Sequence, residues 1–168
     1  MIVIRGTAKL FFIGTLALFS LESSAAGSAK ELAALHAVDQ AWVKAAYNAG
    51  DADGVANLYD KHAVLLPPGA PGVSGRAAIR AFFAKDTAAS AKDGVTFSLG
   101  STPGGGVSGA MGWASGTYAV KDQSGRVVDT GKYLSVSMKK GGKWLYVRDT
   151  WNSDAAPPPA DNPASQKK

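Results

Sequence analysis

An aspartate on the last predicted strand is the residue whose setting most favours chemistry. Asp149 follows Val147 and precedes Trp151 at the spacing that places alternate residues on one strand face. A carboxyl group on an otherwise apolar face needs a hydrogen-bonding partner, or burial raises its pKa. Such a carboxyl group can transfer protons as a general acid or base. The structural alternative is that Asp149 and Asn152 satisfy backbone groups, or each other, where the sheet ends.

The remaining residue types argue against metal and nucleotide chemistry. The chain has two histidines, His36 and His62, and no cysteine, so we expect no metal site. His36 precedes Asp39 by three residues, which favours a structural His–Asp contact over catalysis. The segment 104–109 matches the glycine pattern of dinucleotide sites, but a strand rather than a helix follows it. We therefore interpret it as a flexible loop between strands and expect no cofactor.

Helical periodicity dominates the first part of the chain. One face of residues 30–49 is apolar and includes Asp39 and Trp42, which predicts a long helix that ends at Gly50. Asp51 is expected to cap a second helix. The apolar stripe of that second helix is Val55, Leu58 and Tyr59. These elements would place Asp39 on the buried side of the first helix.

The period then changes from helical to strand-like. A short strand is predicted over 63–66, a Pro-Gly loop over 67–72, and a third helix from Ser74 or Gly75 that turns Ile79, Phe82 and Phe83 inward. Further strands are expected over 95–99, 111–120, 127–138 and 143–151, with a Pro-Gly loop over 101–106 and a tight hairpin at 141–142. Helices first and a meander afterwards indicate an α+β protein.

Both ends of the chain differ from the part between them. Arg5 and Lys9, the apolar run 10–21 and the small residues 24–26 have the order of a signal peptide, so we expect residues 1–26 to be removed and the protein to be periplasmic or secreted. The apolar run is too short for a stable membrane anchor. The proline-rich segment 155–168 is expected to be a disordered tail. The charge of +5 is spread without a basic stripe, so no nucleic-acid partner is expected.

Two segments carry a resemblance to a known superfamily. Residues 50–83 read as a short helix, a short strand, a Pro-Gly turn and another helix, and residues 143–154 read as a closing strand that ends in polar and aromatic groups. This order resembles the nuclear-transport-factor-2-like superfamily, and within it the SnoaL-like and ketosteroid-isomerase-like proteins, over residues 29–154. The resemblance implies three N-terminal helices packed on a strongly curved antiparallel sheet, a cone-shaped, cystatin-like α+β barrel with a pocket in its mouth.

The aromatic residues are too numerous for a small core alone. A cone lined with such rings would hold a small apolar or aromatic molecule. The alternative is that most of them simply fill the core, the role that we expect for Phe82 and Leu58. The residues expected to line the pocket are Trp42, Tyr59, Phe83, Trp113, Tyr133, Trp151 and Asn152.

The resemblance to ketosteroid isomerase implies a specific catalytic base. That class of enzyme uses a carboxylate on the first strand, with a tyrosine and a protonated carboxylic acid forming an oxyanion hole. The matching position here is Leu66 or Pro67, and neither can accept a proton. The best remaining candidate for a pocket acid or base is Asp149, then Asp39, with Asp129 also possible.

We therefore expect an exported small-molecule-binding domain with an aromatic-lined apolar pocket. One alternative is an isomerase, cyclase or hydratase that uses Asp149 or Asp39 as general acid–base. Another is an interaction domain, since proteins of this superfamily commonly dimerise on the convex face of the sheet. The last strand carries Leu145 and Val147 on one face and Trp144 and Tyr146 on the other, and helices can cover only one face, so we expect a homodimer.

Overall fold

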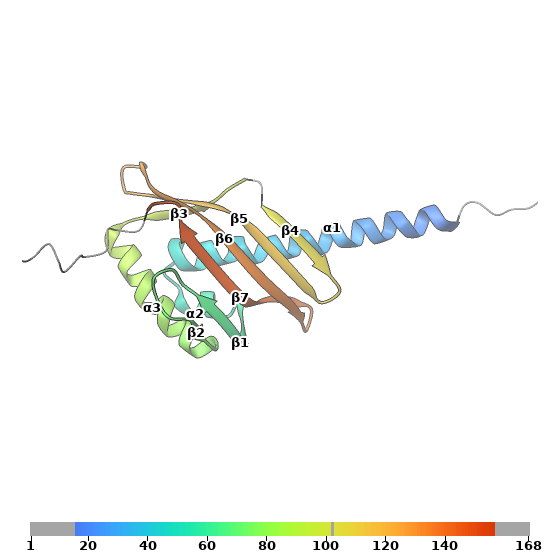
Figure 1. Cartoon of the computed structure of the whole chain (residues 1–168), viewed down its shortest axis with the longest axis horizontal. Coiled ribbons are helices and arrows are strands. Elements are labelled where there is room, and N and C mark those ends of the chain that lie inside the picture. The colour runs from blue at the N-terminus through green and yellow to red at the C-terminus, as the bar shows by residue number, and fades with distance from the viewer. Residues whose placement is uncertain (1–15, 102, 157–168) are drawn as a thin grey trace, which may run out of the picture.

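A computed structural model describes residues 16–101 and 103–156. Its helices lie on one side of a curved seven-stranded sheet (Figure 1). In chain order the elements are α1 (Leu16–Val43), the π-helical turn η1 (Lys44–Asn48), α2 (Ala52–Ala56), β1 (Tyr59–Leu66), β2 (Val73–Ser74), α3 (Arg76–Asp93), β3 (Thr96–Leu99), β4 (Gly104–Ser108), β5 (Met111–Lys121), β6 (Val127–Lys140) and β7 (Lys143–Ser153). The predicted α+β class and the three-helix arrangement are confirmed.

The first helix is longer than its apolar periodicity predicted. It begins at Leu16 rather than near residue 30, and Figure 1 shows its N-terminal part running beyond the sheet. The predicted cleavage point near residue 26 lies within this helix, whereas residues 1–15 and most of the predicted tail, 157–168, lie outside the described residues. In the part of the chain that the structure describes, no helix is long and apolar enough to cross a membrane.

The second helix is shorter than predicted, and this changes the role of Tyr59. The carboxylate of Asp51 accepts a hydrogen bond from the Gly54 backbone N–H at 2.8 Å, as expected of an N-cap. The helix then ends at Ala56, and Tyr59 begins β1 instead of extending the helical stripe. Its backbone pairs with Tyr146 on β7, so sheet pairing overrides the helical spacing. Tyr59 is thereby fully buried under the sheet's helical side.

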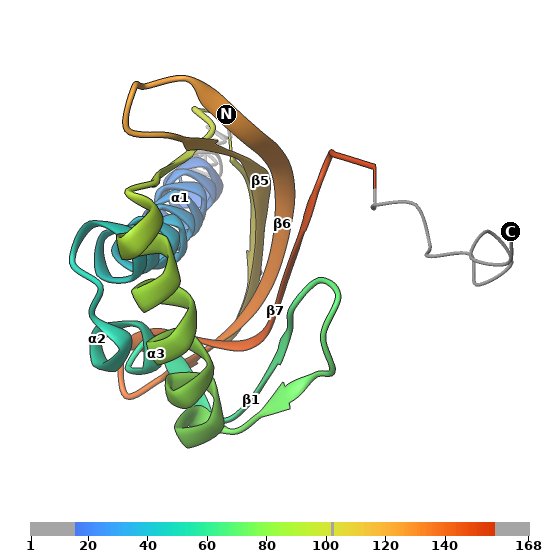
Figure 2. The same cartoon turned by 90° about the vertical axis from the view of Figure 1, so that its left-hand side faces the viewer.

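The sheet is mixed rather than purely antiparallel. The strand order is β2-β1-β7-β6-β5-β3, with β4 also paired to β5. All neighbours are antiparallel except β1 and β7, which run parallel. A parallel pair needs a long connection, and here β2, α3 and the other strands lie between the two in the chain. Figure 2 shows that the long strands bend around α1, with α2 and α3 on the same side. This bend produces the predicted curved sheet, whose concave face is turned to the helices.

The glycine run after β3 is a strand and not the flexible loop that the sequence suggested. Residues 104–108 pair with 111–115 of β5 in a regular antiparallel register. A side chain at Gly105 would place its Cβ 2.7 Å from His36 Nε2 and from Leu32 Cδ1, both on α1. Glycine is therefore needed here because it lets α1 lie directly against the sheet.

The core lies between α1, α3 and the concave face of the sheet. Its largest fully buried apolar and aromatic side chains are Tyr59, Phe83, Leu35, Leu65, Ile79 and Val55. The hairpin that joins β6 to β7 turns at Gly141 and Gly142, whose φ angles are +55° and +78°, as a type I′ turn requires. This predicted turn fixes the pairing of the two strands that carry most of the site.

Candidate functional site

A pocket opens on the concave face of the sheet beside the C-terminal half of α1. Its lining residues are Asp39, Trp42, Phe97, Leu99, Tyr118, Tyr133, Tyr146, Asp149 and Trp151. The hollow measures about 440 Å³ out to its open mouth. The part of it that the centre of a water molecule can reach is only about 40 Å³. That space holds roughly three water molecules, so a large ligand would need lining side chains to move. Two aspartates and a set of aromatic rings therefore share a small, mostly apolar hollow.

A β-bulge decides which way Asp149 faces. Tyr146 pairs with Ser137 and Arg148 with Val136, so Val147 is an extra residue on β7. A bulge shifts the alternation of side chains by one residue. Asp149 therefore shares the inner face of Tyr146 and, as predicted, of Trp151; all three line the pocket, whereas Val147 does not. Only 8% of Asp149 is exposed, which makes it a buried carboxyl at the base of the pocket.

Two side chains from other elements hold Asp149 in place. The hydroxyl group of Tyr59 on β1 donates a hydrogen bond to Asp149 Oδ2 at 2.5 Å. The indole Nε1 of Trp42 on α1 in turn donates to the Tyr59 hydroxyl oxygen at 3.0 Å. Helix, first strand and last strand thus meet in one chain of hydrogen bonds that ends at the carboxyl group. The structural alternative is seen in its backbone form: Asn152 Nδ2 donates to the Ser153 carbonyl at 3.2 Å, and the Thr150 backbone N–H donates to Asp149. A contact between Asp149 and Asn152 themselves is absent from the described hydrogen bonds.

Asp39 is the second carboxyl group of the pocket. The Tyr146 hydroxyl donates to its Oδ1 at 2.6 Å, and the Tyr133 hydroxyl donates to its Oδ2 at 3.3 Å. His36 Nε2 lies 3.2 Å from the carbonyl oxygen of Gly104, and His36 interacts with Asp39 electrostatically rather than through a described hydrogen bond. The hydrogen bonds described for Asp39 come from tyrosines of β6 and β7.

Burial keeps both carboxyl groups from ionising at their usual pH. Burial is the main cause that raises the pKa of Asp149 to about 7. The hydrogen bond from Tyr59 lowers this pKa, and the charge of Asp39 raises it. Burial likewise raises the pKa of Asp39, against the hydrogen bonds from Tyr146 and Tyr133. Since each ionised carboxyl disfavours the other, the two aspartates titrate as a coupled pair.

The tyrosines that contact these aspartates stay protonated. Burial and the neighbouring carboxyl groups raise the pKa of Tyr59, Tyr133 and Tyr146 above its usual range. Each therefore keeps its hydroxyl proton and acts as a donor at neutral pH. The site thus contains two carboxyl groups with raised pKa and three tyrosine hydroxyl groups that donate hydrogen bonds to them.

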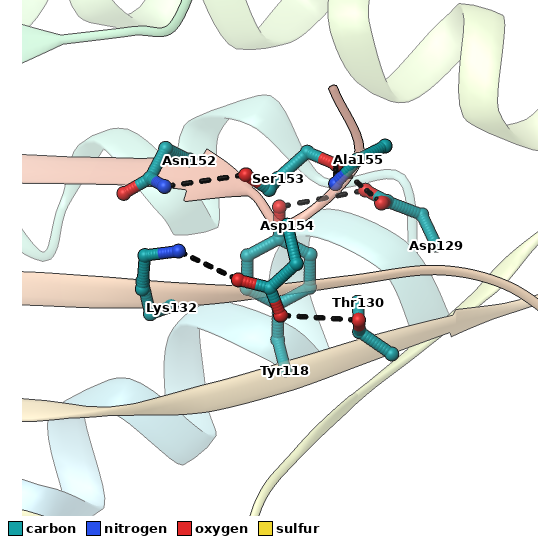
Figure 3. A network of polar contacts seen from close by, with 8 residues as sticks. All are labelled: Tyr118, Asp129, Thr130, Lys132, Asn152, Ser153, Asp154 and Ala155. Atoms are coloured by element: carbon teal, nitrogen blue, oxygen red, sulfur yellow. Dashed lines mark hydrogen bonds and ion pairs between the residues drawn. The ribbon is translucent and has the colours of Figure 1, made fainter. Parts of the chain in front are cut away.

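A polar network lies where β7 ends beside β6, and it includes the pocket residue Tyr118 (Figure 3). Asp129 accepts hydrogen bonds from Ser153 at 2.5 Å and from the Tyr118 hydroxyl at 3.5 Å. Beside it, Asp154 accepts from Lys132 Nζ at 2.6 Å and from the hydroxyl of Thr130. Asp129, the third carboxyl candidate, therefore belongs to this network and is absent from the pocket lining.

The structure brings some of the predicted pocket residues together and separates others. Trp42, Tyr133 and Trp151 line the pocket with both aspartates, and Tyr59 lies behind Asp149 as its hydrogen-bond donor. Phe83 is fully buried behind the wall, 5.5 Å from the ring of Trp42. Trp113 is 46% exposed, and Asn152 is exposed as well; neither lines the pocket. Each lies on the outer face of its strand, next to residues that face inward.

Sequence reasoning missed several lining residues. Phe97 and Leu99 alternate on β3, and Tyr118 stacks on Phe97 with ring centroids 4.9 Å apart. Tyr146 was assigned to the face opposite Asp149 because the bulge was not foreseen. The alternation of Phe97 and Leu99 was the available signal for β3, whereas nothing in the sequence marks the bulge.

Comparisons with solved structures place this architecture in the NTF2-like class with a cystatin-like fold. An NTF2-like protein from Novosphingobium aromaticivorans aligns with a TM-score of 0.69 at 19% identity, over 84% of this chain and 92% of that one. A ketosteroid isomerase-like protein from Erwinia carotovora atroseptica gives 0.56 at 20% identity, over 75% and 98%. An NTF2-like protein of unknown function from Pseudomonas putida gives 0.66 at 14% identity, over 77% and 99%.

The family within this class follows from the sequence match. The SnoaL-like domain family matches residues 40–147, and the chain belongs to that family. The matched segment begins next to Asp39 and ends just before the strand turns Asp149 inward. No curated protein matches the chain.

Proposed function

We propose that the protein binds a small, flat, largely apolar molecule in the pocket between α1 and the sheet. The observation that carries this proposal is that two buried carboxyl groups line the same aromatic-walled hollow. Burying two carboxyl groups near each other costs free energy, and apolar side chains at these positions would give a more stable core. A binding site has a reason to keep them, because a ligand can use the acceptors.

The aromatic walls of the pocket favour a flat ligand. Trp42 and Trp151 lie 6.5 Å apart between ring centroids, and Phe97 stacks with Tyr118 nearby. Flat rings favour flat ligands, since stacked and edge-to-face contacts need a planar partner. The small free space favours a ligand of about one ring over one the size of a steroid.

Native mass spectrometry of protein purified from its own host tests the binding proposal. We expect a retained small molecule on the wild type and its loss in Leu99→Trp, because the larger ring would fill the pocket. Leu66→Trp is the matched control, since Leu66 is 46% exposed and lies outside the pocket lining. A mass that survives Leu99→Trp, or an empty wild type that also fails to bind any added ligand, would contradict the proposal.

A second candidate function is proton transfer on the bound molecule. The observation that favours it is the pKa of about 7 for Asp149, which suits a general acid–base near neutral pH. The acid–base group would then come from β7, with Asp39 of α1 beside it, and not from the end of β1 where ketosteroid isomerases carry theirs. Loss of turnover when the carboxyl is replaced distinguishes proton transfer from binding alone.

We also propose that the outer face of the sheet forms a homodimer. Met111, Trp113 and Leu134 on β5 and β6 are 52%, 46% and 47% exposed, and the described helices all lie on the other side of the sheet (Figure 2). Exposed apolar side chains gathered on one face are typical of a protein–protein interface.

Analytical ultracentrifugation at micromolar concentration tests the dimer. We expect the wild type to sediment as a dimer and Trp113→Lys as a monomer, because a charge at the centre of the interface would be buried without a partner. Val128→Lys is the control, since Val128 is equally exposed but lies at the far end of β6. A monomeric wild type would overturn this proposal.

A further inference from the structure

The charged groups of the pocket are suited to accept hydrogen bonds from a ligand. Among the lining residues, the charged groups are Asp39 and Asp149, and the lining includes no lysine, arginine or histidine. His36, one turn before Asp39 on α1, is directed at the Gly104 carbonyl on β4. An anionic ligand would therefore meet two carboxyl groups and no compensating cation.

The tyrosine hydroxyl groups that contact these aspartates already donate to them. The hydroxyl groups of Tyr146 and Tyr133 donate to Asp39, and that of Tyr59 donates to Asp149. The Trp42 Nε1–H donates to Tyr59 as well. An ionised carboxylate has about four acceptor positions, so each aspartate keeps unused capacity after these bonds. A ligand that fits must bring donors of its own.

The walls of the pocket favour positive charge on that ligand. Trp42, Phe97, Tyr118 and Trp151 present aromatic rings to the same hollow. The faces of aromatic rings attract cations, and aromatic cages are a recurrent way to bind ammonium groups. Carboxylates and aromatic rings thus both favour a cation here, whereas a neutral apolar ligand would use only the rings.

We propose that the ligand is a small organic cation, a protonated amine attached to a flat apolar body. Its N–H groups bind Asp149 and Asp39, and its ring lies between the aromatic walls. This inference rests on the proposed binding function and adds the charge of the ligand to it. The cation also explains the paired carboxyl groups, because it neutralises charge that the protein alone leaves buried.

Binding of a cation should be linked to deprotonation of the site. The titratable groups that face Asp149 are Tyr59 on β1, Asp39 on α1, Tyr133 on β6 and Tyr146 on β7, and His36 on α1 also acts on Asp39. The tyrosines remain neutral, so Asp149, whose pKa is raised to about 7, is the group whose charge changes between pH 5.5 and pH 8, and the raised pKa of Asp39 acts in the same direction. Protonation at the lower pH removes the charge that an ammonium group needs, and affinity should fall.

Three probes of matched shape test the inference on the wild-type protein: benzylammonium, benzyl alcohol and benzoate. Calorimetry at pH 8 should show benzylammonium binding about 10- to 100-fold more tightly than benzyl alcohol, as expected for charged hydrogen bonds, with benzoate weakest. At pH 5.5 the affinity for benzylammonium should fall at least about tenfold, while that for benzyl alcohol stays unchanged.

The outcomes separate this inference from the binding proposal. Equal or tighter binding of benzyl alcohol or benzoate would overturn the cation but leave the pocket as a binding site. If none of the three binds at millimolar concentration, the cation is overturned, and a retained ligand in native mass spectrometry decides whether the binding proposal survives. A pH-independent affinity for benzylammonium would also contradict the role given to the two aspartates.

A pair of variants ties the charge preference to the site. Asp149→Asn should bring the affinity for benzylammonium close to that for benzyl alcohol. Asp60→Asn should leave the preference unchanged, because Asp60 is a buried carboxyl outside the pocket that pairs with Lys140 Nζ at 2.7 Å. A preference that survives Asp149→Asn would show that the carboxyl does not contact the amine.

Discussion

Replacing Asp149 by asparagine is expected to make the ligand-free protein more stable at pH 8. The carboxyl group is buried, and its pKa is raised from 3.8 to about 7. A shift of that size corresponds to roughly 4 kcal/mol of unfavourable free energy when the group is ionised. Asparagine has nearly the same shape and still offers an acceptor to Tyr59, so a gain of roughly 2–4 kcal/mol in the free energy of unfolding follows.

The raised pKa of Asp149 also predicts how the stability of the wild type changes with pH. Because the folded state holds the Asp149 proton more tightly than the unfolded state, wild-type stability should fall as pH rises from about 4 to about 7 and then level off. The variant should lack most of that slope. Urea unfolding at pH 5 and pH 8 measures both quantities.

Asp60, a buried aspartate outside the pocket, provides the control with the opposite sign. The hydrogen bond from Lys140 lowers the pKa of Asp60, so its ionised form stabilises the fold. Asp60→Asn should therefore destabilise the protein at pH 8 and matter less as pH falls toward the range where the carboxyl is protonated. If Asp149→Asn also melts below the wild type at pH 8, then Asp149 supports the fold and the functional role proposed here is wrong.

The same substitution should reduce function while it increases stability. If Asp149 transfers a proton, its loss should lower turnover by about 10²–10⁴-fold. If it only binds, ligand affinity should fall without a reaction to measure. An increase in stability together with a loss of function is expected where a residue that destabilises the fold is needed for function. A residue that serves only the core would lose both together.

The fold could be predicted from local patterns, because each pattern is visible within a few residues. Asp51 as an N-cap and Gly141-Gly142 as a tight turn need only their neighbours, and the structure confirms both. The glycine strand β4 could not be predicted in this way. Its role depends on α1, whose Leu32 and His36 approach Gly105 from more than sixty residues away in the chain.

The site was harder to predict because it depends on register. Asp149 was selected correctly as a buried carboxyl, but its neighbours were assigned from strict alternation, which the extra residue Val147 breaks. Tyr59 was placed on a helix, although its hydroxyl group reaches Asp149 from β1. Such contacts join residues that are ninety positions apart, and no local rule of spacing specifies them.

Phe83→Ala is expected to cause a large loss of stability. The ring is fully buried and packs on Trp42, on Trp151 at 6.4 Å between ring centroids, and on Tyr59 at 6.0 Å. Removing a buried phenylalanine ring typically costs about 3–5 kcal/mol, since the transfer free energy is lost and a cavity remains. That is a large fraction of the roughly 5–15 kcal/mol that stabilises a typical domain. Ligand affinity should fall as well, because the ring supports both tryptophans of the pocket wall.

The adjacent residue is the matched control for Phe83. Phe82 is the same type of residue on the same helix, but it is only half-buried and touches Phe83 edge-on at 5.3 Å. Its hydrophobic contribution scales with the smaller area that it buries, so Phe82→Ala should cost less than half as much and leave ligand affinity unchanged. Urea unfolding and calorimetry on the two variants measure both effects. Equal losses from the two substitutions would show that the wall of the pocket does not depend on the ring behind it.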